Sequence, residues 1–199
     1  MSTTLLQSTA PAVHAPAACR ITADAGTQWR LANGTPVRVR PVSPRDRAAL
    51  GRFIAALGPA SRQARYGTTA AGLSDARLAA LTDIDPDHEV GFVITVPDEG
   101  GERIVGELRF VIDGSTGSAD IALVVAEGWQ RLGLGTRALL ALVRAASRRR
   151  LQWLRADVHC GDESTLRMLQ HCGFTATPHP DDAVLTRLHL LLLPPFPGQ

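Results

Sequence analysis

Residues 121–136 read IALVVAEGWQRLGLGT, and this stretch decides the fold class. An apolar run typical of a buried strand comes first, and Gly133 and Gly135 then open a helical pattern that continues to Arg150. A helix start leaves about four backbone N–H groups unpaired and carries roughly half a positive charge, so it can hold a pyrophosphate. Glycine lets phosphates approach the backbone closely. The stretch therefore predicts a mixed α/β protein with a phosphate-binding loop between a strand and a helix.

Strand and helix patterns alternate on both sides of this stretch. Upstream, an Asn33-Gly34 turn predicts a hairpin, and Ser43 and Ser74 each precede an amphipathic helical pattern. Strands are predicted at 29–31, 37–40, 90–96, 104–112, 119–125, 153–159, 174–177 and 184–192, and helices at 44–57, 61–66, 75–81, 134–150 and 163–172. Short turns make the three central strands an antiparallel meander, and the helix at 134–150 is a crossover.

Length and composition fit one folded domain with short extensions. The chain has 199 residues, of which 45% are apolar and 20% charged, as in ordinary globular proteins. Residues 1–26 predict a flexible N-terminal arm, 27–193 a single domain, and 194–199 a proline-rich tail.

Charge and cysteine content exclude several classes of function. The net charge is only +2 and all 21 basic residues are arginine, which argues against nucleic-acid binding. No segment approaches the roughly 20 apolar residues of a membrane span. Cys19, Cys160 and Cys172 are odd in number and form no CxxC pair, so the sequence indicates neither a disulfide framework nor a metal site. A cytoplasmic protein without a metal is expected.

The glycine loop has a second interpretation as a dinucleotide-binding fingerprint. Gly133 to Ala138 match GxGxxA, and Asp157 lies about 20 residues further on, where a ribose-binding acid is expected. In that fold, however, the glycines follow the strand almost directly, whereas residues 126–132 intervene here. An NAD(P)-binding oxidoreductase is therefore the weaker interpretation, and a Walker loop fails because no Gly-Lys-Ser/Thr follows.

Read as Gln/Arg-x-x-Gly-x-Gly/Ala, the loop resembles motif A of the GNAT (Gcn5-related) N-acetyltransferases. Further matches are Arg40-Pro41 with Ser43 to Asp46, Ile104-Val105-Gly106 and Cys172-Gly173-Phe174, so the resemblance covers roughly residues 36 to 178. Its closest pattern is the acetyltransferase domain of bacterial Pat-type protein-lysine acetyltransferases. The resemblance implies an α/β (α+β) GNAT fold: a mixed, mostly antiparallel sheet of six to seven strands with splayed central strands and about four flanking helices.

The resemblance also implies a site for acetyl-CoA as cosubstrate. In this family the pantetheine arm pairs with the open edge of a strand, and the pyrophosphate binds amides at the following helix start. By resemblance the cofactor-binding residues are Leu123, Val124 and Val125 on the strand, and Gln130, Arg131, Leu132, Gly133, Leu134, Gly135, Thr136 and Arg137 in the loop and helix. A backbone N–H near Val125 is expected to stabilise negative charge on the carbonyl oxygen.

The resemblance further implies transfer to a primary amine, here predicted to be a protein lysine or a small molecule. Such an amine is almost wholly protonated at neutral pH, so a carboxylate or a water held by one is expected as base. Asp120 stands where relatives place a glutamate, and Glu107 is the substitute candidate, although strand alternation could point it to solvent. Leu169 stands where many relatives carry a proton-donating tyrosine, and Asp162 replaces a frequent asparagine.

Two predictions concern regulation and assembly. The missing tyrosine and the shortened acid leave open a non-catalytic acyl-CoA sensor as the alternative to an enzyme. Residues 188–193 are leucine-rich and predict a homodimer contact.

Overall fold

The computed structural model describes residues 27–192, and the arm and tail predicted at 1–26 and 194–199 lie outside this range. The helices and strands are β1 (Gln28–Arg30), β2 (Pro36–Pro41), η1 (Pro44–Asp46), α1 (Arg47–Ala56), α2 (Pro59–Tyr66), α3 (Asp75–Thr82), β3 (Glu89–Asp98), β4 (Gly101–Asp113), β5 (Ser118–Val125), η2 (Glu127–Trp129), α4 (Leu134–Arg148), β6 (Trp153–His159), α5 (Glu163–His171), β7 (Thr175–Pro178) and β8 (Leu185–Leu191).

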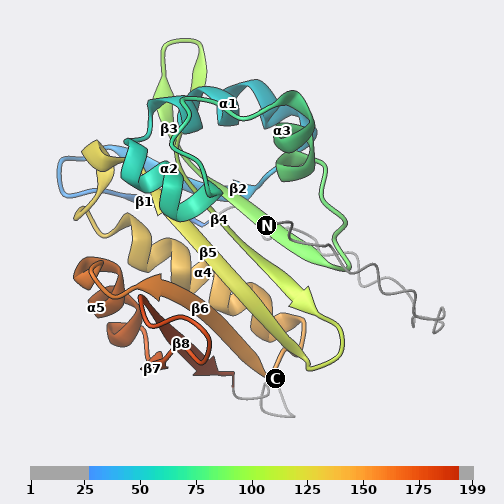
Figure 1. The fold of residues 1–199 in the computed structure, drawn as a ribbon. Coiled ribbons are helices and arrows are strands. Elements are labelled where there is room, and N and C mark those ends of the chain that lie inside the picture. Colours follow the sequence, from blue (N-terminus) through green and yellow to red (C-terminus); the bar gives the residue numbers. More distant parts are fainter. Residues whose placement is uncertain (1–26, 193–199) are drawn as a thin grey trace.

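The strands form one sheet in the order β1-β2-β3-β4-β5-β6-β8-β7 (Figure 1). Within residues 27–192, neighbouring strands are antiparallel except β5 and β6, which α4 connects as a parallel pair. The predicted mixed, mostly antiparallel fold is confirmed. The described chain has eight strands where six to seven were expected, and five α-helices where about four were expected.

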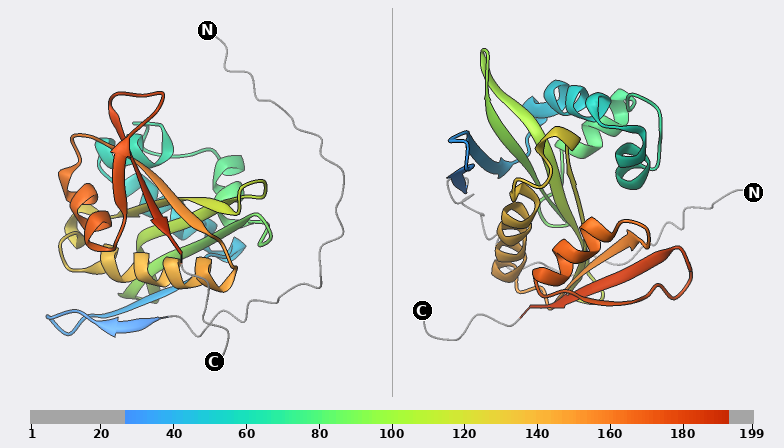
Figure 2. Two further views of the ribbon diagram at one scale, coloured as in Figure 1. Left: turned by 90° about the horizontal axis from the view of Figure 1, so that it is seen from below. Right: turned by 90° about the vertical axis from the view of Figure 1, so that its left-hand side faces the viewer.

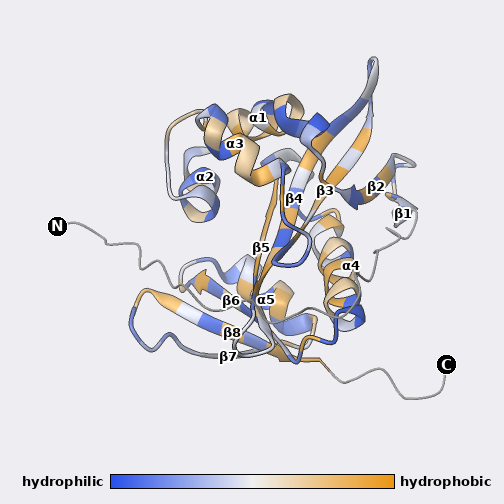
Figure 3. Cartoon of the chain, turned by 90° about the vertical axis from the view of Figure 1, so that its right-hand side faces the viewer, coloured by the Kyte–Doolittle hydropathy of each residue, from blue (hydrophilic) through white to orange (hydrophobic). Residues whose placement is uncertain are grey.

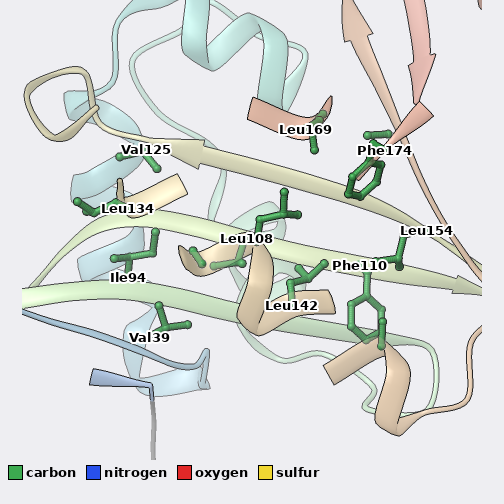
Figure 4. Packing of buried hydrophobic residues seen from close by; sticks show 14 of the residues in the cluster. Val39, Ile94, Leu108, Phe110, Val125, Leu134, Leu142, Leu154, Leu169 and Phe174 are labelled. Atoms are coloured by element: carbon green, nitrogen blue, oxygen red, sulfur yellow. The ribbon is translucent and has the colours of Figure 1, made fainter. Parts of the chain in front are cut away.

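Helices on both faces of the sheet bury two hydrophobic clusters. On one face α4 places Leu134 and Leu142 against Leu108 of β4, in the cluster drawn in Figure 4. On the other face α1 and α3 cover β3 and β4, where Leu50 packs in a cluster with Val93. Figure 2 shows α4 and the α1–α3 group on opposite sides of the central strands.

Strands β5 and β6 separate toward their carboxyl ends, which confirms the predicted splay. They pair only where Ser118–Asp120 meets Trp153–Arg155. From Ile121 to Val125, β5 remains paired with β4 on one edge, while β6 pairs with β8 instead. Figure 3 shows β6 and β8 diverging from β5. The carboxyl half of β5 therefore has an edge that no strand of the described chain covers.

Local signals explain most element boundaries. Gly34 adopts a φ of 82° in the β1–β2 turn, as the Asn-Gly pair predicts. The Ser74 hydroxyl accepts a hydrogen bond from the Arg77 amide (3.4 Å) and caps α3. Helix α4 ends two residues earlier than predicted, because Arg150 takes a φ of 58° that no right-handed helix accommodates.

The leucine-rich segment predicted as a homodimer contact is only partly exposed. Leu188 is fully buried, and its strand β8 is paired on one edge with β6 and on the other, from Thr186 to His189, with β7. Leu191 is 51% exposed, and Leu193 lies outside the described residues. Leu188 is therefore not accessible to a second subunit, whereas a homodimer through the rest of the segment stays a prediction. Within residues 27–192, no helix has both the length and the apolarity needed to cross a membrane.

Candidate active site

The start of α4 presents a row of free backbone amides. Its N-cap is Gly133, no side chain caps it, and the first helical hydrogen bond runs from the Arg137 amide to the Gly133 carbonyl (3.2 Å). In the described part of the chain, no protein group accepts a hydrogen bond from the amides of residues 131–136. Leu134 is 1% exposed and anchors this turn beside Val125 in the core (Figure 4), whereas residues 131–133 are exposed. The loop therefore offers its donors to an external ligand.

The two glycines of the loop have different physical roles. Gly133 has a φ of 77°, and a Cβ at this position would meet open space. A Cβ on Gly135 would lie 2.8 Å from the Met168 sulfur of α5, so this glycine permits α5 to pack against α4. That both glycines also let phosphates approach the backbone stays a prediction. Gly133 supplies the backbone conformation and an unobstructed surface, whereas Gly135 supplies room for protein packing.

The open edge of β5 begins directly before this loop. The Gln130 side chain donates from Nε2 to the Val125 carbonyl (2.9 Å), and the Ala126 amide donates to Val105 of β4 (2.9 Å). Because successive residues of a strand turn their backbone groups to opposite edges, Leu123 and Val125 face the open edge and Val124 faces β4. Leu123 and Val125 therefore have free backbone groups on that edge, and their pairing with a cofactor stays a prediction. The Val124 backbone is directed to β4, and Gln130 serves to hold the loop to β5.

Uncompensated positive charge surrounds the free amides. The first turn of α4 contains no acidic residue, although acidic side chains are favourable at a helix start. Arg131 is exposed with a φ of 59°, and the Arg137 guanidinium carbon lies 5.6 Å from the centroid of the Trp29 ring. Neither arginine forms an ion pair within residues 27–192. The arrangement favours a bound anion.

Asp120 lies where β5 and β6 part. Its Oδ1 accepts a hydrogen bond from Arg155 Nε (2.9 Å) and its Oδ2 from Arg155 Nη2 (3.4 Å). The Arg155 side chain also approaches Asp113 at 3.6 Å. The Asp120 side chain is 66% exposed, and strand alternation puts it on the same face as Val124, which packs with α1 and α3. Solvent and an acceptor can therefore reach this carboxylate, although an arginine holds it.

Glu107, by contrast, is fully buried. Its carboxylate accepts hydrogen bonds from Arg65 Nε (3.0 Å), from Arg109 Nε and from the Tyr66 hydroxyl (3.3 Å). Arg109 also pairs with Glu89. A bulge at Val105 in β4 sets this orientation, since Ile94 pairs with Gly106 and Thr95 with Ile104.

The expectation that Glu107 could point to solvent is corrected. Its contacts occupy both carboxylate oxygens and the residue is fully buried, which argues against the base role predicted as a substitute for Asp120. Of the two predicted carboxylates, only Asp120 is exposed.

Glu127 is a structural residue that sequence reasoning missed. Its Oε1 accepts hydrogen bonds from the Gly58 amide (2.9 Å) and the Ser61 hydroxyl (2.8 Å), so it caps α2 from 69 and 66 residues away. Burial alone would raise the pKa of Glu127, but these hydrogen bonds outweigh burial and hold the pKa below its ordinary value. The segment before the glycine loop is thereby fastened to α2.

Other candidate residues are engaged inside the protein. Burial and the neighbouring Glu107 raise the pKa of Tyr66, the one tyrosine of the chain, and keep its hydroxyl protonated. Leu169 is 3% exposed in the core, and Asp162 caps α5 by accepting from the Thr165 amide (3.0 Å). Asp157 pairs with Arg187 (2.9 Å). Within residues 27–192, no group of acidic, histidine or cysteine side chains is arranged to hold a metal.

Comparisons with known proteins agree with this geometry. Residues 37–175 match the family model described as "Acetyltransferase (GNAT) domain". An acetyltransferase of Pseudomonas aeruginosa is 30% identical over 169 residues, which is 83% of this chain and 91% of the relative.

Solved structures show the same fold. The GNAT domain of S. lividans PAT superposes with a TM-score of 0.72 at 22% identity, covering 84% of this chain and 97% of that one. A spermidine N-acetyltransferase from Vibrio cholerae, solved with CoA and spermine, gives a TM-score of 0.62 at 16% identity and covers 78% of this chain and 95% of that one.

The oxidoreductase interpretation of the loop is wrong, because the described sheet is mostly antiparallel and Asp157 is held by Arg187. The free amides, the open edge of β5 and the family match lead to one conclusion: the chain belongs to the GNAT acetyltransferase family.

Proposed function

We propose that this acetyltransferase moves an acetyl group from acetyl-CoA to a primary amine. The observation that carries the proposal is the run of unpaired amides at residues 131–136, next to the open edge of β5. A CoA molecule carries a pyrophosphate that can accept from such amides, and its pantetheine arm has amides that can pair with a strand edge. The residues present therefore fit this cosubstrate.

A lysine on a protein is the acceptor that the charges near the gap between β5 and β6 favour. There, Asp120 pairs with Arg155, and Asp157 pairs with Arg187. A free polyamine needs several carboxylates that are not already neutralised, whereas one lysine in a peptide needs room and few charges. The spermidine N-acetyltransferase represents the polyamine class, whereas the charge balance here supports a protein lysine. The odd number of cysteines, without a CxxC pair, further favours a cytoplasmic location for such a substrate.

Asp120 is proposed to accept the proton of the attacking amine, directly or through one water. The amine nitrogen forms a bond to the acetyl carbonyl carbon, the carbon–sulfur bond breaks, and CoA leaves as a thiolate that takes a proton from solvent. Acetyl-CoA supplies the activated thioester. The backbone N–H of Val125, which faces the open edge, would stabilise negative charge on the carbonyl oxygen. Because the Tyr66 hydroxyl is buried against Glu107, no role as proton donor is assigned to it.

Isothermal titration of the full chain with acetyl-CoA tests the binding half of the proposal. Saturable binding in the micromolar range is expected, and no binding at high micromolar concentration would remove the proposal. A mass-spectrometric transfer screen against cell lysate and an amine library then tests the acceptor class. Acetylated protein lysines are expected, whereas transfer to polyamines alone would contradict the lysine assignment.

Replacement of the proposed base distinguishes an enzyme from a sensor. Asp120→Asn should lower kcat about a hundredfold, because general base catalysis contributes about 10²–10⁴, while acetyl-CoA affinity stays unchanged. Asp113→Asn is the matched control, since Asp113 also contacts Arg155 but has no proposed role as a base. Unchanged turnover in Asp120→Asn would exclude this base. Binding by the wild type without turnover on any amine would favour the non-catalytic sensor.

A further inference from the structure

The β1–β2 hairpin lies beside the start of α4 (Figure 2) and touches the candidate phosphate site through one side chain. The guanidinium carbon of Arg137 lies 5.6 Å from the centroid of the Trp29 ring, within cation–π distance. The Trp29 backbone pairs with Val37 in β2, and its partly buried side chain packs against the core cluster that includes Leu31. Strand pairing and core contacts therefore restrict the ring.

Arg137 is placed to act on a ligand at the free amides. It lies four residues after Gly133, so both are on the same side of α4, and helical side chains tilt toward the N-terminus. Its charge therefore projects over the turn that carries the amides. Arginine has a long, mobile side chain, so a surface that restricts it favours one direction of the guanidinium.

The stacking ring lies outside the part of the chain that matches the family. The family model begins at residue 37, the second arm of the hairpin, whereas Trp29 is in β1. Arg137, in contrast, is inside the matched segment. The family model therefore does not include the strand whose ring contacts this arginine of the cofactor loop region.

We infer that Trp29 is a positioning residue that stacks on Arg137 and directs its guanidinium toward the phosphates of CoA. The inference rests on the proposed function, since it needs CoA at the start of α4. It makes the β1–β2 hairpin part of the cofactor site, although the ring itself touches no substrate. Loss of the ring should therefore weaken CoA binding by no more than the loss of Arg137 does.

Titration of CoA into full-length variants tests this coupling. Trp29→Leu should weaken CoA binding about fivefold, and Trp29→Phe, which keeps an aromatic face, should restore it to within about twofold. Arg137→Met should weaken binding about tenfold, because it removes a charge-assisted contact. The double variant Trp29→Leu with Arg137→Met should bind no more weakly than Arg137→Met alone. Thermal unfolding of each variant reports any loss of folded protein.

The outcomes separate this inference from the proposed function. Equal CoA affinity for wild type and Trp29→Leu would overturn the positioning role while leaving the function in place. Additive losses in the double variant would also overturn it, because Trp29 would then act independently of Arg137. Absence of CoA binding by the wild type would remove the proposed function and this inference together.

Discussion

The segment between β5 and α4 lies next to the starts of two helices, and only one of these starts is capped by a protein side chain. At α2 the Glu127 carboxylate binds the Gly58 amide and the Ser61 hydroxyl, so that end is closed by the protein itself. At α4, only six residues after Glu127, the amides of residues 131–136 have no partner among residues 27–192 and two arginines flank them. The acidic side chain nearest in sequence to the start of α4, that of Glu127, thus caps α2 instead. The difference indicates that the start of α4 is kept open for an anion from outside the chain.

A similar contrast exists between two carboxylates on one face of the sheet, at β4 and β5. Under α2, the buried Glu107 is saturated by Arg65, Arg109 and Tyr66. Farther along that face, where β5 and β6 part, Asp120 is 66% exposed and has one arginine partner. A buried, fully hydrogen-bonded carboxylate such as Glu107 stabilises the fold, whereas an exposed carboxylate such as Asp120 remains available for chemistry.

The largest expected effect is a loss of stability when the buried charge of Glu107 is removed. Glu107→Gln removes the charge that compensates Arg65 and Arg109 in the interior, and loss of one partner of a buried ion pair costs about 3–5 kcal/mol. Urea unfolding should show this loss of stability, while the folded fraction binds acetyl-CoA as the wild type does. Asp157→Asn is the control, because its pair with the half-exposed Arg187 should contribute about 0–1 kcal/mol. Normal stability with lost turnover would instead make Glu107 the base and contradict the comparison.

A smaller effect, on CoA affinity, is expected when an acidic side chain is placed at the uncapped start of α4. Thr136→Glu puts a carboxylate in the first turn of α4, where an exposed acid stabilises a helix by about 0.3–1 kcal/mol. The same charge should repel the phosphates and lower CoA affinity about tenfold. Thr136→Gln matches the size without the charge and should leave affinity within about twofold. If Thr136→Glu bound CoA like Thr136→Gln, the phosphates would not lie at these amides.

The sequence alone could predict the elements and the open loop because these depend on local patterns. The strand at 153–159 and the start of the helix at Leu134 are as predicted, since alternation, glycine spacing and apolar periodicity are visible within a short window. The run of amides at 131–136 follows from the same window. Only the structure could show that these amides have no hydrogen-bond partner within residues 27–192.

The partners of the charged side chains could not be predicted, because these contacts join residues far apart in the chain. The direction of Glu107 depends on a bulge at Val105, which reverses strand alternation and has no signal in the sequence. Its partner Arg65 is 42 residues away, and the Arg155 partner of Asp120 is 35 residues away. The role of Gly135 likewise depends on Met168 of a later helix. Local sequence patterns thus predicted where ligands could bind, whereas the direction and partners of each charged side chain could be found only from the tertiary structure.

The smallest expected effect concerns the cap that Glu127 gives to α2. The pKa of Glu127 is lower in the folded protein than the ordinary glutamate value of about 4.3, so its contribution to stability is full above that value and is lost as the pH falls through the folded pKa. Glu127→Gln should therefore destabilise the protein at pH 7 by about 1 kcal/mol or less, since the group is exposed and solvent screens it. Urea unfolding of both proteins at pH 7 and at about pH 3.5 measures the change. Because protonation removes the charge that Gln lacks, the difference between the two proteins should shrink at the lower pH. A difference that stays constant would mean that Glu127 acts by shape rather than by charge, and α2 would then no longer be a charge-capped counterpart to the open start of α4.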